Sequence, residues 1–221
     1  MKTALYVLPV LAIFVFLLVR AEFGKKRNQI FVFKPISTLL VIAAACLSFG
    51  EPSPNRLYSV GVLVGLALSF CGDLALMFPE NRKAFTIGLG FFLSAHIAYA
   101  VVFLILGRFS TWDILSTALL AAAAFGIYML LKPNLGSMKI PIIFYIAIIS
   151  VMVSRAISTA ASPEFGAGQK WMVAAGAVLF YISDVILAAA RFWKPWKRNR
   201  ISLAFYYGGQ FLIALAASFF A

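Results

Sequence analysis

Charged residues are scarce in this sequence. Of 221 residues, 12% are charged and 63% are hydrophobic. A water-soluble domain of this length needs more polar surface to cover its core. A helix that crosses a bilayer takes about 20 residues, so eight crossings with short connections use nearly the whole chain. The composition therefore predicts an all-α, polytopic membrane protein with a single transmembrane domain over residues 1–221.

Residue types that build many enzyme sites are also rare. The single histidine, His96, excludes a three-histidine zinc site, and no nucleophile motif accompanies it for a Ser–His protease. The two cysteines, Cys46 and Cys71, lie in apolar runs and indicate buried packing residues rather than a disulfide framework or a zinc cluster. No Gly-rich phosphate loop is present, so nucleotide chemistry has no support. We expect neither a metal nor a cofactor.

Apolar segments separated by turn residues indicate about eight transmembrane helices. The breaks contain Pro, Asn, Glu and Ser, which are typical of turns. The expected helices span residues 4–19, 30–49, 57–78, 84–106, 112–131, 139–161, 171–190 and 201–220.

The basic residues are distributed unevenly along the chain. A net charge of +12 in a soluble protein would suggest nucleic acid, but here the basic residues lie in short connections, where a membrane explains them better. Thirteen of the 19 Lys and Arg residues fall in the odd-numbered connections, against four on the other side. Because basic connections stay in the cytoplasm, both termini are expected outside, with the simplest location a bacterial inner membrane. The first apolar run precedes its basic cluster and is expected to be retained.

Two stretches half a chain apart resemble each other. Residues 65–73 end in Gly72-Asp73 and residues 176–184 end in Ser183-Asp184, each with a glycine eight residues before the aspartate. The offset of 111 residues joins helices that run in the same direction, which suggests two parallel four-helix halves. A chance match over so short a segment stays open as the alternative.

The two aspartates are the strongest candidates for a functional site. A carboxyl group within a transmembrane helix costs about 2.5–3.5 kcal/mol on insertion scales, and such groups usually face the bundle interior or a wet cavity. At 1.5 Å per residue, Asp73 and Asp184 are both expected about 7–9 Å from the cytoplasmic boundary. The alternative is that each carboxyl merely bonds a neighbouring helix.

Other polar side chains are expected in the same part of the bundle. Lys34 either binds a phosphate as a point charge or extends to the interface. Two tyrosines near the start of the last helix face either the site or an aromatic belt, and the histidine either lines the cavity or only packs. Tyr206 is expected in the same part of the bundle. The residues predicted to bind substrate are Lys34, Ser69, Ser183, Tyr207 and Gln210, with His96 and Tyr99 closer to the mid-plane.

The order of these motifs resembles the lysoplasmalogenase-like family of multi-pass membrane proteins, also called the YhhN family. The resemblance covers almost the whole chain. Its elements are Lys34-Pro35, Ser69-x-x-Gly72-Asp73-x-x-Leu76-Met77, Gly88-x-x-x-Phe92-x-x-x-His96-x-x-Tyr99, Gly176-Ala177-x-Leu179-Phe180-x-x-Ser183-Asp184-x-x-Leu187-Ala188 and Tyr207-x-x-Gln210.

The resemblance implies hydrolysis of the vinyl ether bond of a lysoplasmalogen, a lysophospholipid, to a fatty aldehyde and a glycerophospho-base. The family's aspartates correspond to Asp73 and Asp184. A carboxylic acid that protonates the alkenyl carbon and a carboxylate that steers water suit this chemistry, as in glycoside hydrolysis. A proton-coupled transporter is the alternative from another class. A structural protein and an intramembrane aspartyl protease, which Gly72-Asp73 faintly resembles, are the remaining hypotheses.

Overall fold

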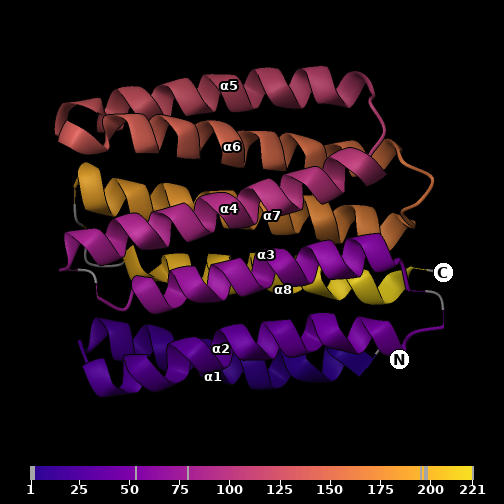
Figure 1. Ribbon diagram of the computed structural model, residues 1–221, viewed down its shortest axis with the longest axis horizontal. Helices are drawn as coiled ribbons and strands as arrows, with labels where there is room; N and C mark the ends of the chain where they lie inside the picture. Colours follow the sequence, from indigo (N-terminus) through magenta and orange to yellow (C-terminus); the bar gives the residue numbers. More distant parts are fainter. Residues whose placement is uncertain (1–2, 53, 79, 195, 197–198, 221) are drawn as a thin grey trace.

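Long helices run side by side along one axis and form a single layered bundle (Figure 1). The computed structural model describes residues 3–52, 54–78, 80–194, 196 and 199–220, and this part contains helices and turns but no strand. A short 3-10 turn (Thr3–Tyr6) leads into the first helix. The helices are α1 (Val7–Phe23), α2 (Arg27–Leu47), α3 (Arg56–Ala75), α4 (Arg82–Leu106), α5 (Thr111–Leu131), α6 (Lys139–Ser158), α7 (Ala167–Phe192) and α8 (Ser202–Ala216).

The prediction of an eight-span membrane protein is confirmed. Within the described residues, eight helices are long and apolar enough to cross a bilayer. Two boundaries near the aspartates differ from the expected ones. The α3 helix ends at Ala75 and turns through Leu76 and Met77, whereas α7 continues to Phe192. Asp73 therefore lies in the last turn of its helix, and Asp184 lies about two turns before the end of its own.

Short polar side chains fix where several helices begin. The Asn55 carbonyl oxygen accepts a hydrogen bond from the backbone N–H of Tyr58, and the Asn81 carbonyl oxygen accepts from two backbone N–H groups at the start of α4. Ser110 and Asp113 form a capping box at the start of α5. These caps satisfy N–H groups that have no partner within the helix, which a membrane protein cannot leave bare in hydrocarbon.

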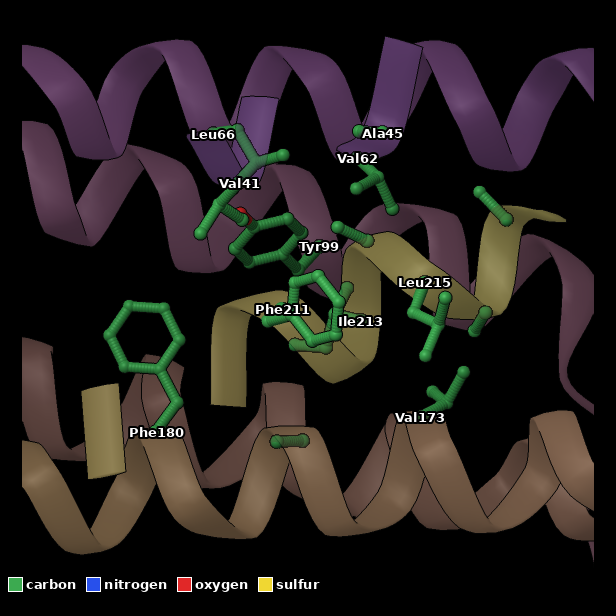
Figure 2. Close-up of a cluster of buried hydrophobic side chains, with 14 of the residues drawn as sticks. Val41, Ala45, Val62, Leu66, Tyr99, Val173, Phe180, Phe211, Ile213 and Leu215 are labelled. Carbon is green, nitrogen blue, oxygen red and sulfur yellow. The ribbon is translucent and has the colours of Figure 1, made fainter. Parts of the chain in front are cut away.

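The α8 helix lies at the centre of the bundle. Of its apolar window, 67% is buried, whereas the corresponding value for α5, at the edge, is 11%. Figure 2 shows apolar side chains of α2, α3, α4 and α7 converging on α8. Large apolar side chains such as Phe16, Phe125 and Trp171 point outward, where hydrocarbon is the expected neighbour. Cys46 lies exposed on this outer surface, so the prediction of two buried cysteines is wrong for it.

Backbones approach most closely where α7 crosses α8. A Cβ atom added to Gly209 would lie 2.6 Å from the carbonyl oxygen of Gly176, and one added to Gly176 would lie 2.8 Å from the carbonyl oxygen of Gly209. Small residues allow such contacts between transmembrane helices. The crossing fixes the position of α8, which carries part of the site.

The helix contacts repeat with an offset of four helices. The contact of α1 with α2 recurs between α5 and α6, that of α3 with α4 between α7 and α8, and that of α2 with α3 between α6 and α7. The contact of α4 with α6 has its counterpart between α8 and α2. In Figure 1, α5 and α6 lie at one edge and α1 and α2 at the opposite edge. This pattern supports the hypothesis of two parallel four-helix halves.

Candidate active site

Asp73 is surrounded by donors from two other helices. Its Oδ2 atom accepts hydrogen bonds from the Thr38 hydroxyl and the Tyr206 hydroxyl, both at 2.7 Å. The Lys34 Nζ atom lies 3.3 Å from Oδ1. The carboxyl side chain is only 3% exposed. A buried carboxyl group is tolerated when it is paired and hydrogen-bonded, and Asp73 has both kinds of partner.

Lys34 is turned inward rather than toward the interface. The residue is 6% exposed, and its ammonium group is paired with Asp73. Neither sequence-based alternative for Lys34 anticipated this ion pair. Tyr207 lies behind it, where its hydroxyl donates to the backbone carbonyl of Lys34 at 3.1 Å and lies 3.2 Å from the Thr38 hydroxyl. Both tyrosines of α8 are buried, so the aromatic-belt alternative is wrong.

Asp184 has a different environment from Asp73. Its Oδ2 atom accepts a hydrogen bond from the Tyr145 hydroxyl at 2.6 Å, and the Nε2 atom of His96 lies 3.5 Å away. No lysine or arginine forms an ion pair with this carboxyl in the described part of the chain. His96 is fully buried and packs against the rings of Tyr145 and Phe180. The histidine therefore packs as a core residue and also contacts the candidate site.

Both aspartates line one cavity of about 990 Å³, counted with its open mouth. The cavity walls come from α1, α2, α3, α4, α7 and α8, and its mouth lies at the end of the bundle where α1 and α7 finish. Ser183 and Tyr206 also face it. Its ionisable lining residues are Glu22, Lys34, Asp73, Asp184, Arg191 and Arg200. Among the described residues, no cluster of three or more His, Cys, Asp or Glu side chains could hold a metal ion.

An apolar pocket of about 640 Å³ adjoins this cavity. It extends between α4, α5, α6 and α7 and is lined almost entirely by aliphatic and aromatic side chains. The two spaces share Asp184, and the shared wall also includes Phe85, Phe92 and Arg191. The site thus joins a polar mouth to an apolar pocket, with a carboxyl group at the junction. The remaining residues common to both linings are Leu76 and Leu187.

The other predicted site residues form a layer away from the cavity wall. The Tyr99 hydroxyl donates to the Gln210 carbonyl oxygen at 3.4 Å. The Ser69 hydroxyl is buried, and the Gln210 amide nitrogen is buried with no hydrogen-bond partner in the described part of the chain. None of these side chains is among the residues that line the two spaces, and neither are His96 and Tyr207. These residues are therefore not part of the lining of either space, and their assignment to substrate binding stays a prediction.

The surroundings of the two aspartates are related by the offset of 111 residues. Asp73 is contacted from α2 and α8, and Asp184 is contacted from α6 and α4, which are the equivalent helices. Lys34 and Tyr145, the nearest partners from α2 and α6, occupy matching positions at this offset. Tyr99 and Gln210 match too, and they contact each other. If the chain consists of two related halves, equivalent residues that touch each other are expected on the axis between them, so this contact supports that hypothesis.

Sequence reasoning missed Thr38, Tyr145 and Arg191. Thr38 is one helical turn from Lys34, so the spacing places both side chains on the same face of the helix and could have indicated Thr38. Adding the offset to Lys34 would have identified Tyr145. Arg191 lies just beyond residue 190, where the seventh expected helix ends, so the sequence places it in a connection, whereas the structure places it on α7. Conversely, Asp113 is a buried acid that belongs to no cavity wall described above; it is paired with Arg155 at 2.5 Å.

Comparison with known proteins connects this geometry to a family. Two curated proteins named lysoplasmalogenase, from Mycobacterium bovis and Mycobacterium tuberculosis, are each 31% identical to the chain over 161 residues. The match covers 71% of this chain and 58% of each relative, so the chain spans less than two thirds of their length. No solved structure gives a significant match. The model of the YhhN family matches residues 29–217, which include every residue of the candidate site except Glu22, and the chain therefore belongs to the YhhN family.

Proposed function

We propose that this protein is a membrane-embedded hydrolase that cleaves the vinyl ether bond of a lysoplasmalogen. The observation that carries the proposal is the pair of carboxyl groups with unlike surroundings in one cavity. The names of the two mycobacterial relatives and the family membership support the same reaction. The shape agrees with a lysolipid, because the apolar pocket can take the alkenyl chain and the open cavity can take the polar head.

Asp184 is assigned as the acid. In the described part of the chain it has one hydroxyl donor and no lysine or arginine partner, and an apolar wall disfavours an unpaired charge at this position. The acid donates its proton to the β-carbon of the alkenyl ether, and the electron pair of the double bond forms the new C–H bond. The α-carbon becomes an oxocarbenium ion, stabilised by the ether oxygen and by the nearby negative charge of Asp73.

Asp73 is assigned as the base. Lys34, Thr38 and Tyr206 hold its carboxylate in place. The carboxylate takes a proton from water as the water oxygen bonds to the α-carbon, giving a hemiacetal. Asp184 then accepts the hemiacetal hydroxyl proton while Asp73 returns its proton to the ether oxygen. The carbon–oxygen bond breaks, aldehyde and alcohol form, and both carboxyl groups regain their starting states.

The test measures aldehyde release from a lysoplasmalogen by purified protein in detergent. We expect Asp73→Asn and Asp184→Asn each to lower turnover by at least about a hundredfold, whereas Glu164→Gln, on an exposed turn at the other end of the bundle, leaves it unchanged. In D₂O the aldehyde should carry one deuterium on the carbon next to the carbonyl, trapped before exchange. A saturated ether analogue should not be cleaved.

Two results would overturn the proposal. Folded aspartate variants with full turnover would remove both carboxyls from the reaction. Absence of hydrolysis by folded parent protein, together with uptake that follows a pH gradient in vesicles, would favour a proton-coupled transporter.

A further inference from the structure

Arg191 lies at the junction of the two spaces that make up the site. It lines both the polar cavity and the apolar pocket, near the end of α7. Its guanidinium carbon lies 4.8 Å from the centre of the Phe85 ring. Phe85 is itself held edge-on by Phe192, with ring centres 6.0 Å apart. A guanidinium group stacked on a fixed ring keeps its N–H edge free for a planar, two-point contact with an oxyanion.

The charges around the cavity are balanced except at two positions. Lys34 is paired with Asp73 at 3.3 Å. At the mouth, Arg200 is paired with Glu22, also at 3.3 Å. Two ionisable lining residues remain, Arg191 and Asp184, and neither forms an ion pair with an oppositely charged Lys, Arg, Asp or Glu side chain in the described part of the chain. With Asp184 in its acid form, Arg191 is the uncompensated positive charge of the cavity.

The spacing along α7 matches the length of a lysophospholipid. Arg191 follows Asp184 by seven residues, which places it on the same face of the helix and about 10 Å further along the axis. In a lysoplasmalogen, the alkenyl carbon that takes the proton and the phosphorus are separated by seven bonds. These span about 9 Å when extended, with ordinary bond lengths. A substrate with its alkenyl carbon at Asp184 therefore brings its phosphate to the cavity mouth beside Arg191.

We infer that Arg191 binds the phosphodiester of the lysophospholipid and selects phosphate-bearing ethers over neutral alkenyl glycerols. The inference rests on the proposed function for the identity of the lipid. It assigns the phosphate to a residue whose charge is otherwise uncompensated, whereas the ammonium group of Lys34 already neutralises Asp73. The contact is made equally by the bound substrate and by the transition state, so it acts on substrate affinity rather than on the chemical step.

The first experiment compares kinetics of Arg191→Gln on two substrates in phospholipid-free detergent. With a lysoplasmalogen, we expect KM to rise at least about tenfold while kcat changes less than about twofold. With a 1-alkenyl glycerol, which has the same vinyl ether and no phosphate, neither constant should change. With the lysoplasmalogen, Arg191→Lys should give a KM between those of the parent and Arg191→Gln, because lysine keeps the positive charge but loses the planar two-point contact of the guanidinium group. Lys194→Gln, exposed just beyond α7, is the matched control. Equal effects on both substrates, or none, would overturn the inference.

The second experiment measures binding without hydrolysis. The probes are a saturated 1-alkyl lysophosphatidylethanolamine and the corresponding 1-alkyl glycerol. Each probe is titrated against the parent protein and against Arg191→Gln, and binding is followed by the shift in melting temperature. Affinity for the phosphate-bearing probe should fall at least about tenfold in Arg191→Gln, with the neutral probe unchanged. If the parent protein hydrolyses nothing and this difference persists, the proposed function fails and the phosphate site stands. If affinities are equal, the phosphate site fails whatever the hydrolysis assay shows.

A third arm separates the substrate phosphate from phosphates of the surrounding bilayer. Diacyl phosphatidylglycerol is added to the micelles in excess over the probe. If the difference in probe affinity between the parent protein and Arg191→Gln persists, the guanidinium binds the lysolipid in the cavity. If the difference disappears, Arg191 binds bilayer lipid and the inference is overturned.

Discussion

At the scale of single residues, the site depends on a contrast between two equivalent positions. A lysine faces Asp73 from α2, and a tyrosine faces Asp184 from α6. The lysine pairs with its carboxyl as a cation, whereas the tyrosine gives a single neutral hydrogen bond. In the proposed mechanism, this one difference between two positions related by the offset of 111 residues assigns the two carboxyl groups opposite roles.

The hydroxyl of Tyr145 is expected to matter more for turnover than that of Tyr206. Tyr145 is the one hydroxyl donor to Asp184 in the described residues, whereas Asp73 keeps Lys34 and Thr38 when Tyr206 is changed. In the proposed reaction Asp184 becomes a carboxylate as it gives up its proton, and a hydrogen bond to a charged group contributes about 1.5–3 kcal/mol. We expect Tyr145→Phe to lower kcat about tenfold to a hundredfold and Tyr206→Phe to lower it less than about tenfold.

Steady-state kinetics on folded variants, checked by gel filtration, provide the measurement. Tyr128→Phe is the matched control, because it removes a partly buried hydroxyl of α5 that is not among the residues lining the cavity. A Tyr206→Phe defect as large as that of Tyr145→Phe would contradict the assigned difference between the two carboxyl groups.

At the scale of helices, the apolar runs predict the spans well and the contacts poorly. Hydropathy places eight helices because about 20 apolar residues have one stable arrangement in a bilayer. It cannot pair Asp73 with Thr38, since the two lie on different helices and their contact depends on how those helices rotate and cross. The sequence predicts that the seventh helix ends at residue 190, whereas α7 continues to Phe192 and Arg191 packs over the ring of Phe85, a contact between helices that hydropathy does not report.

The crossing of α7 and α8 should not tolerate a methyl group added at Gly209. In Gly209→Ala the new carbon would meet the Gly176 carbonyl oxygen at 2.6 Å, and backbone cannot move aside as a flexible side chain can. Forced contacts of this kind cost about 1–3 kcal/mol. We expect a lower melting temperature and reduced turnover, because α8 carries Tyr206. Gly208→Ala is the control, since its nearest atom would be a Leu179 methyl at 3.8 Å. Equal melting temperatures for the two variants would refute the backbone contact.

At the scale of the whole molecule, the cavity lies at one end of the bundle. Its lining includes Glu22, Arg191 and Arg200, which belong to the ends of α1 and α7 and to the 3-10 turn that precedes α8. This is the end that carries most of the basic residues. Because basic connections stay in the cytoplasm, the distribution of Lys and Arg along the chain predicts that this end faces the cytoplasm.

The orientation itself is tested with reporter fusions in a bacterial host. Alkaline phosphatase joined after residue 221 should be active, and green fluorescent protein at the same place should be dark, because the C-terminus is expected outside. Fusions truncated after Lys132, in an odd-numbered connection, should show the reverse. An active phosphatase at Lys132 would place the mouth of the cavity on the outer face.

In the proposed reaction, the wall shared by the polar cavity and the apolar pocket also separates the two products. A bond broken beside Asp184 would leave the aldehyde with its chain among apolar side chains and the glycerophospho-base at the charged mouth. The aldehyde dissolves in lipid and the glycerophospho-base in water, so we expect the two fragments to leave into different phases. Reversal then requires a lipid and a solute to meet again in one site, so we expect the reverse reaction to be slow even at high local aldehyde.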